Sequence, residues 1–88
     1  MTIQEHILHH CCNVFGVTLE ELQSKSKERH ITAARFCAMY ILRDKSNYSL
    51  KQIGRIFNRH HATVILALKT FERYFQTDTR FFDNYVQV

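Results

Sequence analysis

Apolar side chains recur every three or four residues along most of this chain, a spacing that places them on one face of an α-helix. The first such series consists of Ile3, Ile7, Cys11 and Val14. Gly16 follows this series at the position of a helix C-cap. The pattern predicts a helix over residues 3–15 that buries the four apolar side chains.

Two later segments have the form of a capping box, in which a hydroxyl accepts from an early backbone N–H and a carboxylate or amide reaches back. They are residues 18–21 and 49–52, and they predict helices over residues 19–24 and about 50–57. Between them, residues 25–30 are polar and mostly basic, which predicts an exposed connector. A long helix is expected from Ile31 to about Lys45. Its expected buried residues are Ala34, Cys37, Ala38, Ile41 and Leu42.

The C-terminal half carries the longest helical series, after a turn predicted at residues 58–60. This series consists of Val64, Leu68, Phe71 and Phe75, and it predicts a helix to about Gln76. Asp78 is placed to cap a last helix, whose packing residues would be Phe81, Phe82, Tyr85 and Val86. With no proline and two glycines in 88 residues, strong helix breakers are almost absent. We therefore expect an all-α bundle of five to six helices that forms one domain, residues 1–88.

The two helices around residues 58–60 have the physical pattern of a helix-turn-helix, a short amphipathic helix joined tightly to a longer one that begins with polar residues. The longer helix is expected over about residues 60–76. In a DNA-binding helix-turn-helix, the first residues of the second helix contact base edges in the major groove. Many small helical proteins contain two tightly joined helices, so this pattern alone is a weak indication of DNA binding.

The composition is typical of a soluble domain with an acidic partner. Lys and Arg outnumber Asp and Glu by 12 to 8, for a formal charge of +4. No apolar stretch is long enough to cross a bilayer and no signal-peptide pattern opens the chain, so we expect a cytoplasmic location and no membrane partner. The three cysteines are odd in number and two are adjacent, which favours reduced thiols over disulfides.

Residues 49–64 have the sequence SLKQIGRIFNRHHATV. This segment resembles the signature of the C-terminal, DNA-box-binding domain of the bacterial replication initiator DnaA, roughly S-L-x-x-I-G-x-x-F-G-G-R-D-H-T-T-V. The likeness extends to residues 17–25, which are similar to the helix and basic loop of that family, and to residues 38–40, which are similar to part of its long helix. It covers about Thr2 to Asp78, nearly the whole chain.

The resemblance implies a Trp-repressor-like fold with the recognition helix in the major groove and a basic-loop arginine in the adjacent minor groove. By position, Arg59 matches the arginine that opens the family motif, and Thr63 matches its second threonine. His61 matches a histidine that contacts a thymine methyl group. Arg43 falls where the family has a basic residue directed at the DNA backbone.

Departures from the family signature predict an altered DNA target. His60 stands where the family has an aspartate that accepts from a cytosine amino group, and Ala62 replaces a threonine. The turn is one residue shorter than in the signature. The position of the minor-groove arginine is occupied by Ala33, although Arg29 and Arg35 are close enough to substitute. Readout of cytosine by a carboxylate is therefore expected to be lost.

The predicted site has two parts, and its predicted partner is double-stranded DNA bound in a sequence-selective way. Five residues are expected at base edges: Arg59, His60, His61, Ala62 and Thr63. Nine others are expected on phosphates or in the minor groove: Lys25, Lys27, Arg29, Arg35, Arg43, Ser49, Lys51, Arg55 and Lys69. Either histidine can donate or accept at a base edge, depending on its tautomer.

Metal binding and catalysis are not expected. The N-terminal helix carries five residues of metal-ligand type, His6, His9, His10, Cys11 and Cys12. They point around the helix rather than toward one point, so no metal site or other cofactor is expected. No third orienting group accompanies a Cys–His pair, and no G-x-x-x-x-G-K-S/T phosphate loop occurs. We therefore expect neither an enzyme nor a small-molecule substrate.

Two other binding functions stay open. The first is a protein-interaction module that retains the fold but has lost specific DNA binding. It would use an aromatic C-terminal patch composed of Phe71, Tyr74, Phe75, Phe81, Phe82 and Tyr85. The second is RNA binding, which is less favoured because RNA readers usually present sheet aromatics and no strand pattern is evident here.

Overall fold

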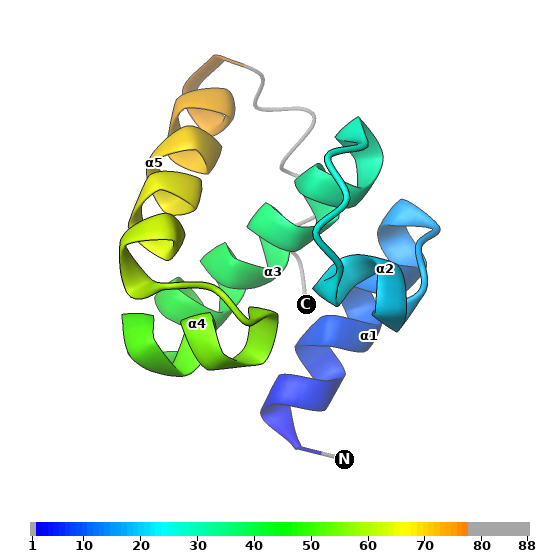
Figure 1. Ribbon diagram of the computed structural model, residues 1–88, viewed down its shortest axis with the longest axis horizontal. Coiled ribbons are helices and arrows are strands. Elements are labelled where there is room, and N and C mark those ends of the chain that lie inside the picture. The colour runs from blue at the N-terminus through cyan, green and yellow to red at the C-terminus, as the bar shows by residue number, and fades with distance from the viewer. Residues whose placement is uncertain (1, 78–88) are drawn as a thin grey trace.

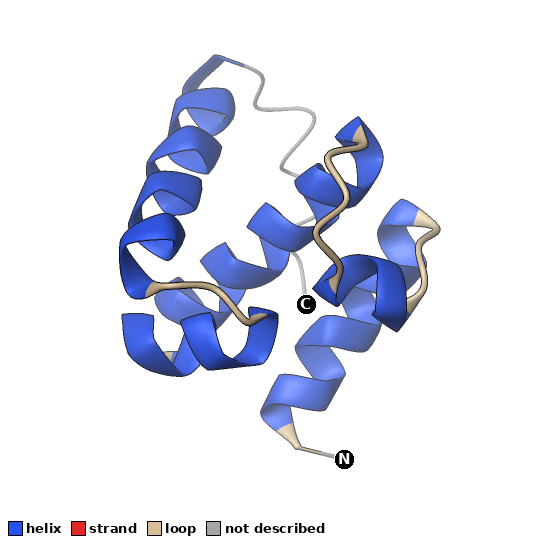
Figure 2. Cartoon of the chain, viewed as in Figure 1, coloured by secondary structure: helices blue, strands red, loops and turns tan. Residues whose placement is uncertain are grey.

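The computed structural model describes residues 2–77, which form five α-helices joined by short loops (Figure 1). The helices are α1 (Ile3–Phe15), α2 (Leu19–Gln23), α3 (Arg29–Ser46), α4 (Leu50–Phe57) and α5 (His61–Thr77). Figure 2 shows only helices and loops over this described part of the chain. No helix within residues 2–77 is long and apolar enough to span a membrane. The all-α prediction is confirmed, whereas the last helix predicted after Asp78 lies outside the described residues.

The helix ends follow the caps predicted from the sequence. The Thr18 hydroxyl accepts from the Glu21 N–H at 3.1 Å, and the Thr18 N–H donates to the Glu21 carboxylate at 2.9 Å. Ser49 and Gln52 form the same reciprocal pair at 3.1 and 2.8 Å. α1 ends at Gly16, whose φ of 67° lies in the left-handed region. Both capping boxes and the glycine C-cap are thus confirmed.

α3 begins earlier than the predicted start at Ile31. The Thr32 N–H donates to the Glu28 carbonyl at 2.9 Å, which places Arg29 and His30 in the first turn of the helix. The connector predicted over residues 25–30 is therefore wrong at its C-terminal end. No glycine or proline precedes Ile31 in this segment, so nothing in the backbone opposes a further helical turn.

α3 is the central helix, because it contacts each of the other four helices. In Figure 1, α1 and α2 lie on one side of α3, and α4 and α5 lie on the other. Its buried apolar residues are Ile31, Ala34, Cys37, Ala38, Met39, Ile41 and Leu42. This list contains all five residues predicted for its buried face. Leu22 of α2, Phe57 of α4 and Val64 of α5 are fully buried and complete the core from both sides.

The predicted buried face of α1 is only partly correct. Ile7 and Cys11 are buried as expected, but Ile3 is 64% exposed and Val14 is 36% exposed. Leu8 is buried instead. Because α1 contacts α2 as well as α3, its buried face includes Leu8 and leaves Val14 partly exposed.

Cys11 and Cys37 pack α1 against α3 as thiols. Neither side chain has exposed surface. A hydrogen bond with Cys37, followed by burial, raises the pKa of Cys11 far above its usual value. A thiolate, the form that binds metals, is therefore strongly disfavoured at Cys11. Within the described residues, no three His, Cys, Asp or Glu side chains are grouped so that they could hold a metal ion.

The turn between α4 and α5 depends on a close contact between two backbone segments. Asn58 ends α4 with a φ of 53°, and the Arg59 N–H donates to the Gly54 carbonyl at 2.7 Å. A Cβ atom at Gly54 would lie 2.5 Å from the Arg59 carbonyl oxygen. Only glycine allows this approach, which sets the direction of α5 relative to α4.

Replacing Gly54 with alanine should push the Arg59 backbone away and strain this turn. We expect Gly54→Ala to lower the free energy of unfolding by about 1–3 kcal/mol, the usual cost of forcing a methyl group into filled space. Urea denaturation followed by circular dichroism measures the change. The exposed Lys51→Ala on the same helix is the matched control and should change stability by less than about 0.5 kcal/mol. Equal stability of the two variants would contradict the role given to Gly54.

Candidate nucleic-acid interface

The start of α5 presents a row of exposed side chains. His60, His61, Ala62 and Thr63 are all exposed, whereas Val64 is fully buried. The buried side of α5 therefore anchors the helix to the core, and the residues before Val64 remain on the surface. This is the arrangement of a recognition helix, whose first residues approach base edges.

His60 caps the N-terminus of α5. Its ring Nδ1 accepts from the Ala62 N–H at 3.1 Å, and its carbonyl accepts from the Thr63 and Val64 N–H groups at 2.9 and 3.3 Å. Its ring also packs on that of His61, with centroids 4.2 Å apart and planes inclined by 33°. These contacts restrain both rings at the helix start.

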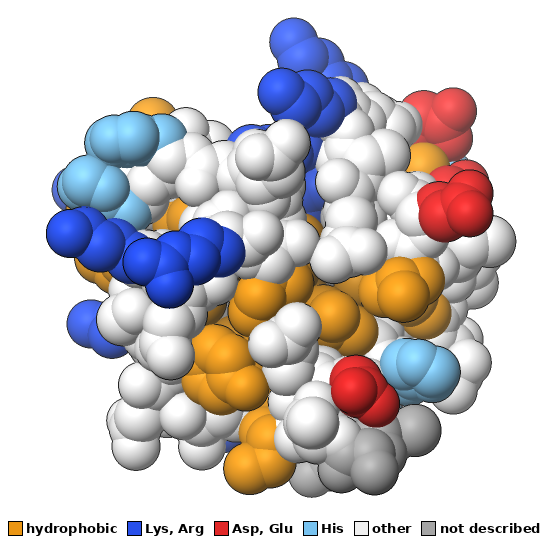
Figure 3. Space-filling model, turned by 60° about the horizontal axis from the view of Figure 1, so that its bottom comes forward, with side chains coloured by type: hydrophobic (Ala, Val, Ile, Leu, Met, Phe, Trp, Pro, Cys, Tyr) orange, Lys and Arg blue, Asp and Glu red, His pale blue; other side chains and the backbone are white. Residues whose placement is uncertain are grey.

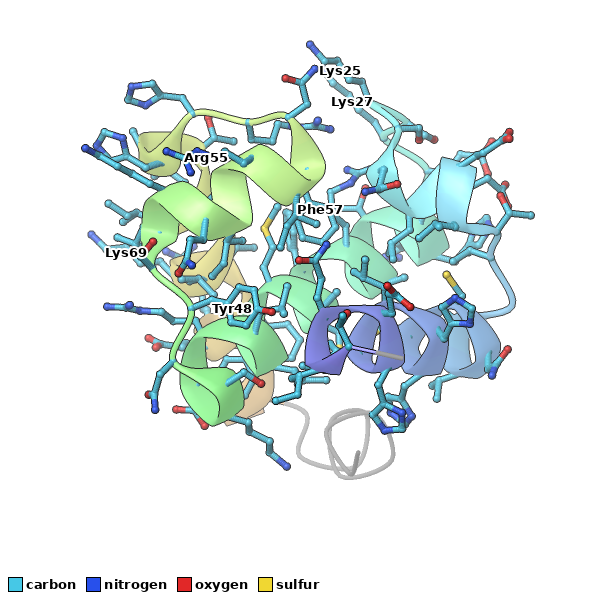
Figure 4. The ribbon with its side chains drawn as sticks, turned by 90° about the horizontal axis from the view of Figure 1, so that it is seen from below. Lys25, Lys27, Tyr48, Arg55, Phe57 and Lys69 are labelled. Atoms are coloured by element: carbon cyan, nitrogen blue, oxygen red, sulfur yellow. The ribbon has the colours of Figure 1, made fainter. Side chains whose placement is uncertain are left out.

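Exposed cations surround this helix end. Lys51 and Arg55 are exposed on α4, and Lys69 is exposed on α5. Lys25 and Lys27 extend from the loop between α2 and α3, away from the body of the protein (Figure 4). Figure 3 shows Lys and Arg side chains gathered on the left and at the top of the visible face, with His side chains beside them on the left, whereas the acidic side chains lie on the right. A surface of this kind attracts phosphate groups.

An open hollow of about 480 Å³ lies between α4 and the start of α5. Its lining includes Lys51, Arg55 and His61. Cations and the helix start therefore face one shared recess, in which a phosphate and a base edge could be contacted together.

Arg35 is not available to DNA, which corrects the prediction made for it. The side chain is 5% exposed, and it donates from Nε to the Leu22 carbonyl and from Nη2 to the Ser26 carbonyl, each at 3.1 Å. Burial, and then the positive charge of Arg59, lower the pKa of Arg35 below its usual value. The side chain is held inside because it lies on the same buried face of α3 as Ile31 and Ala38.

Arg59 is also engaged within the protein. Its Nη1 donates to the Phe57 carbonyl at 2.6 Å, and its Nη2 donates to the Ser24 carbonyl at 2.8 Å. The side chain is half-buried. The guanidinium group of Arg59 is directed at backbone carbonyls from its own turn and from the α2–α3 loop, although Arg59 also lines the hollow. Its contact with a base edge stays a prediction. Phe57, the last residue of α4, lies on the interior side of this helix (Figure 4).

These arginines hold the basic loop against the helix-turn-helix. This loop was predicted over residues 25–30, and between α2 and α3 it comprises residues 24–28. Arg35 donates to one carbonyl of this loop and Arg59 to another. Gln23, which directly precedes the loop, donates from Nε2 to the Ile56 carbonyl of α4 at 2.9 Å. The lysines of the basic loop are therefore carried on a backbone that is tied to α4 and to the turn.

Three more of the predicted phosphate contacts are exposed and do not line the hollow: Arg29, Arg43 and Ser49. Arg43 donates from Nη1 at 3.1 Å to the carbonyl of Tyr48, which lies between α3 and α4 and is labelled in Figure 4. The Ser49 hydroxyl accepts from the Gln52 N–H, which leaves its own proton free for a phosphate. Their contacts with DNA stay predictions.

Sequence analysis missed Leu66, which is 65% exposed. Helical spacing places it on the same face as Ala62 and Lys69, one turn beyond the helix start. The signal in the sequence was that Leu66 is apolar but does not belong to the helically spaced series that begins at Val64. Gln23 was also missed, and its contact with α4 has no local signature in the sequence.

The aromatic patch proposed for a protein partner loses one member. Phe71 is 2% exposed, and its ring lies 4.8 Å from that of Tyr40. Phe71 thus belongs to the buried apolar series predicted for this helix and fills the space between α3 and α5, so it is not available to a surface patch. The side chains of the other proposed members, Tyr74, Phe75, Phe81, Phe82 and Tyr85, lie outside the described residues.

The fold and the exposed helix start define a helix-turn-helix protein. Residues 4–70 match the family model described as bacterial dnaA protein helix-turn-helix, and the chain belongs to this family. The resemblance found in residues 49–64 is thereby confirmed.

Individual relatives agree with this assignment. The chain is 37% identical over 73 residues to the chromosomal replication initiator protein DnaA of Oleidesulfovibrio alaskensis, covering 83% of this chain and 16% of that protein. It is 44% identical over 63 residues to the protein of the same name from Chlorobaculum tepidum, covering 70% of this chain and 13% of the relative. The chain therefore spans less than a fifth of the length of these relatives.

The internal role of Arg35 can be tested by stability. Arg35→Met keeps an unbranched apolar stem but removes the guanidinium group and leaves two carbonyls without their donors, so we expect the free energy of unfolding to fall by about 2 kcal/mol. Arg55→Met, an exposed replacement of the same kind, should change it by less than about 0.5 kcal/mol. Urea denaturation compares the two. A destabilisation no greater than that of Arg55→Met would show that the carbonyl contacts of Arg35 are unimportant.

Proposed function

We propose that this chain binds double-stranded DNA in a sequence-selective way, with α5 in the major groove and the basic loop on the adjacent backbone or minor groove. The observation that carries the proposal is the exposed start of α5, residues 60–63, beside the exposed cations Lys51 and Arg55. A helix is about 10–12 Å across with its side chains, which matches a major groove about 12 Å wide.

The residues at the helix start suit contacts with base edges. Ala62 is small enough to bring the helix close and can contact a thymine methyl group. The Thr63 hydroxyl and the ring of His61 can hydrogen-bond to bases. Leu66 adds an apolar contact one turn farther along. Together they offer polar and apolar contacts of the kind that distinguish base pairs.

The cations suit phosphate contacts, which position a protein on the duplex without reading sequence. Lys51 and Arg55 line the hollow beside the start of α5, and Ser49 caps α4. Lys25 and Lys27 lie on the basic loop, whose backbone is already held in place. Because Arg35 and Arg59 donate to carbonyls of this loop, little backbone conformational entropy would be lost when its lysines meet the phosphates.

The relatives suggest the biological setting. Both are named chromosomal replication initiator proteins, so we infer a role in replication initiation or its regulation. A single domain over residues 1–88 and a cytoplasmic location remain part of this proposal.

Selection of bound sites from random duplex DNA tests the proposal directly. We expect a defined preferred sequence to be enriched over successive rounds. Binding without enrichment would leave only non-specific attraction to DNA, and an absence of binding would remove DNA as the partner.

The electrostatic part of binding should be sensitive to salt. If about four to six phosphates are neutralised, the plot of log affinity against log salt should have a slope of roughly −4 to −5, because each neutralised phosphate releases condensed counterions. Fluorescence anisotropy at several salt concentrations measures the slope. A flat response would contradict phosphate binding by the exposed cations.

Base contacts and phosphate contacts should respond differently to substitution. His61→Ala should weaken binding to the preferred site by about 1–3 kcal/mol and have little effect on a scrambled duplex. Lys51→Ala should weaken both alike and reduce the salt slope by about one unit. The measurement is affinity for the two duplexes, with circular dichroism as a check of folding. An unchanged ratio of the two affinities in His61→Ala would show that His61 does not contact a base.

A further inference from the structure

The cap formed by His60 decides which of its ring nitrogens carries a proton. Nδ1 accepts the Ala62 N–H at 3.1 Å. A ring nitrogen that accepts a hydrogen bond holds no proton, and the neutral imidazole then carries its proton on Nε2. The Nε2 atom of His60 is therefore a donor and not an acceptor.

The direction of this donor is also restrained. The two nitrogens lie on different sides of the ring, so Nε2–H points away from the Ala62 amide. The ring packs on His61 with centroids 4.2 Å apart, and the side chain is exposed. His60 lines the hollow together with Lys51 and Arg55, the cations expected on phosphates. The donor is thus presented at the helix start, where a base edge would lie.

We propose that His60 determines specificity at one base position by presenting Nε2–H as an oriented donor in the major groove. This inference rests on the proposed DNA-binding function. Guanine O6 and N7, adenine N7 and thymine O4 are acceptors there, whereas cytosine presents its N4 amino donor. Guanine offers two acceptors and is the base we expect opposite His60.

Cytosine is disfavoured because two donors would then face each other. Each would lose its hydrogen bond to water on binding without gaining a partner in the interface. At this position we expect guanine to be favoured over cytosine by about tenfold, within the range for one polar base contact.

His60→Asp reverses the polarity of this contact while keeping a residue that caps helices well. Its carboxylate accepts and cannot donate, so it should favour the cytosine amino group. Sites selected from random duplex DNA by the wild-type chain and by His60→Asp should differ at one position, from guanine to cytosine, with a change of about tenfold or more in the affinity ratio. Lys51→Ala is the matched control and should lower affinity for all sequences without changing any preferred base.

The tautomer provides a second measurement that does not depend on DNA. Long-range proton–nitrogen correlation spectra of the free protein distinguish the two neutral forms, and we expect His60 in the Nε2–H form. The Nδ1–H form would overturn the inference even if His60→Asp failed to fold. A preferred site that stays the same in folded His60→Asp would also overturn it and leave the proposed function intact. If the wild-type chain selected no preferred site, the proposed function itself would fail.

Discussion

The contact between the Gly54 and Arg59 backbones is the constraint on which the rest of the interface depends. The Arg59 N–H donates to the Gly54 carbonyl at 2.7 Å, and no side chain at position 54 keeps the two segments apart. This contact directs α5 across α4 so that Val64 enters the core. The residues just before Val64 are consequently turned to the surface, where His60 can cap the helix and present its ring.

Arg59 extends this constraint to a second part of the surface. Its backbone closes the turn, and its side chain donates to the Ser24 carbonyl of the basic loop. Arg35 binds the same loop from α3. Their acceptors in these contacts are neutral carbonyls, so these partners do not cancel the two positive charges. Both arginines therefore add to the positive potential of this surface even though their side chains are committed to holding the loop.

The helix start departs from the signature that residues 49–64 resemble. Where that signature has a carboxylate, His60 has a ring whose Nδ1 caps α5. Ala62 and Leu66 are exposed apolar residues on the same helix. One local hydrogen bond, from the Ala62 N–H to His60 Nδ1, thus connects the cap of α5 with the donor that we propose for base contact.

The sequence by itself determined the helices, both capping boxes, the glycine C-cap and the position of the helix-turn-helix, because these depend on spacing and hydrogen bonds within a few residues. Only the tertiary structure decided the roles of Arg35 and Arg59. From the sequence, the positive charge of both arginines favours the surface. The helical spacing of Arg35 with the buried residues Ile31 and Ala38 is a signal for burial, and Arg59 has no such signal. Both side chains are held by carbonyl oxygens that include those of Leu22, Ser24 and Ser26, which come close only when α2 packs beside α3 and α4. Contacts between segments so far apart along the chain leave no periodic signal in it.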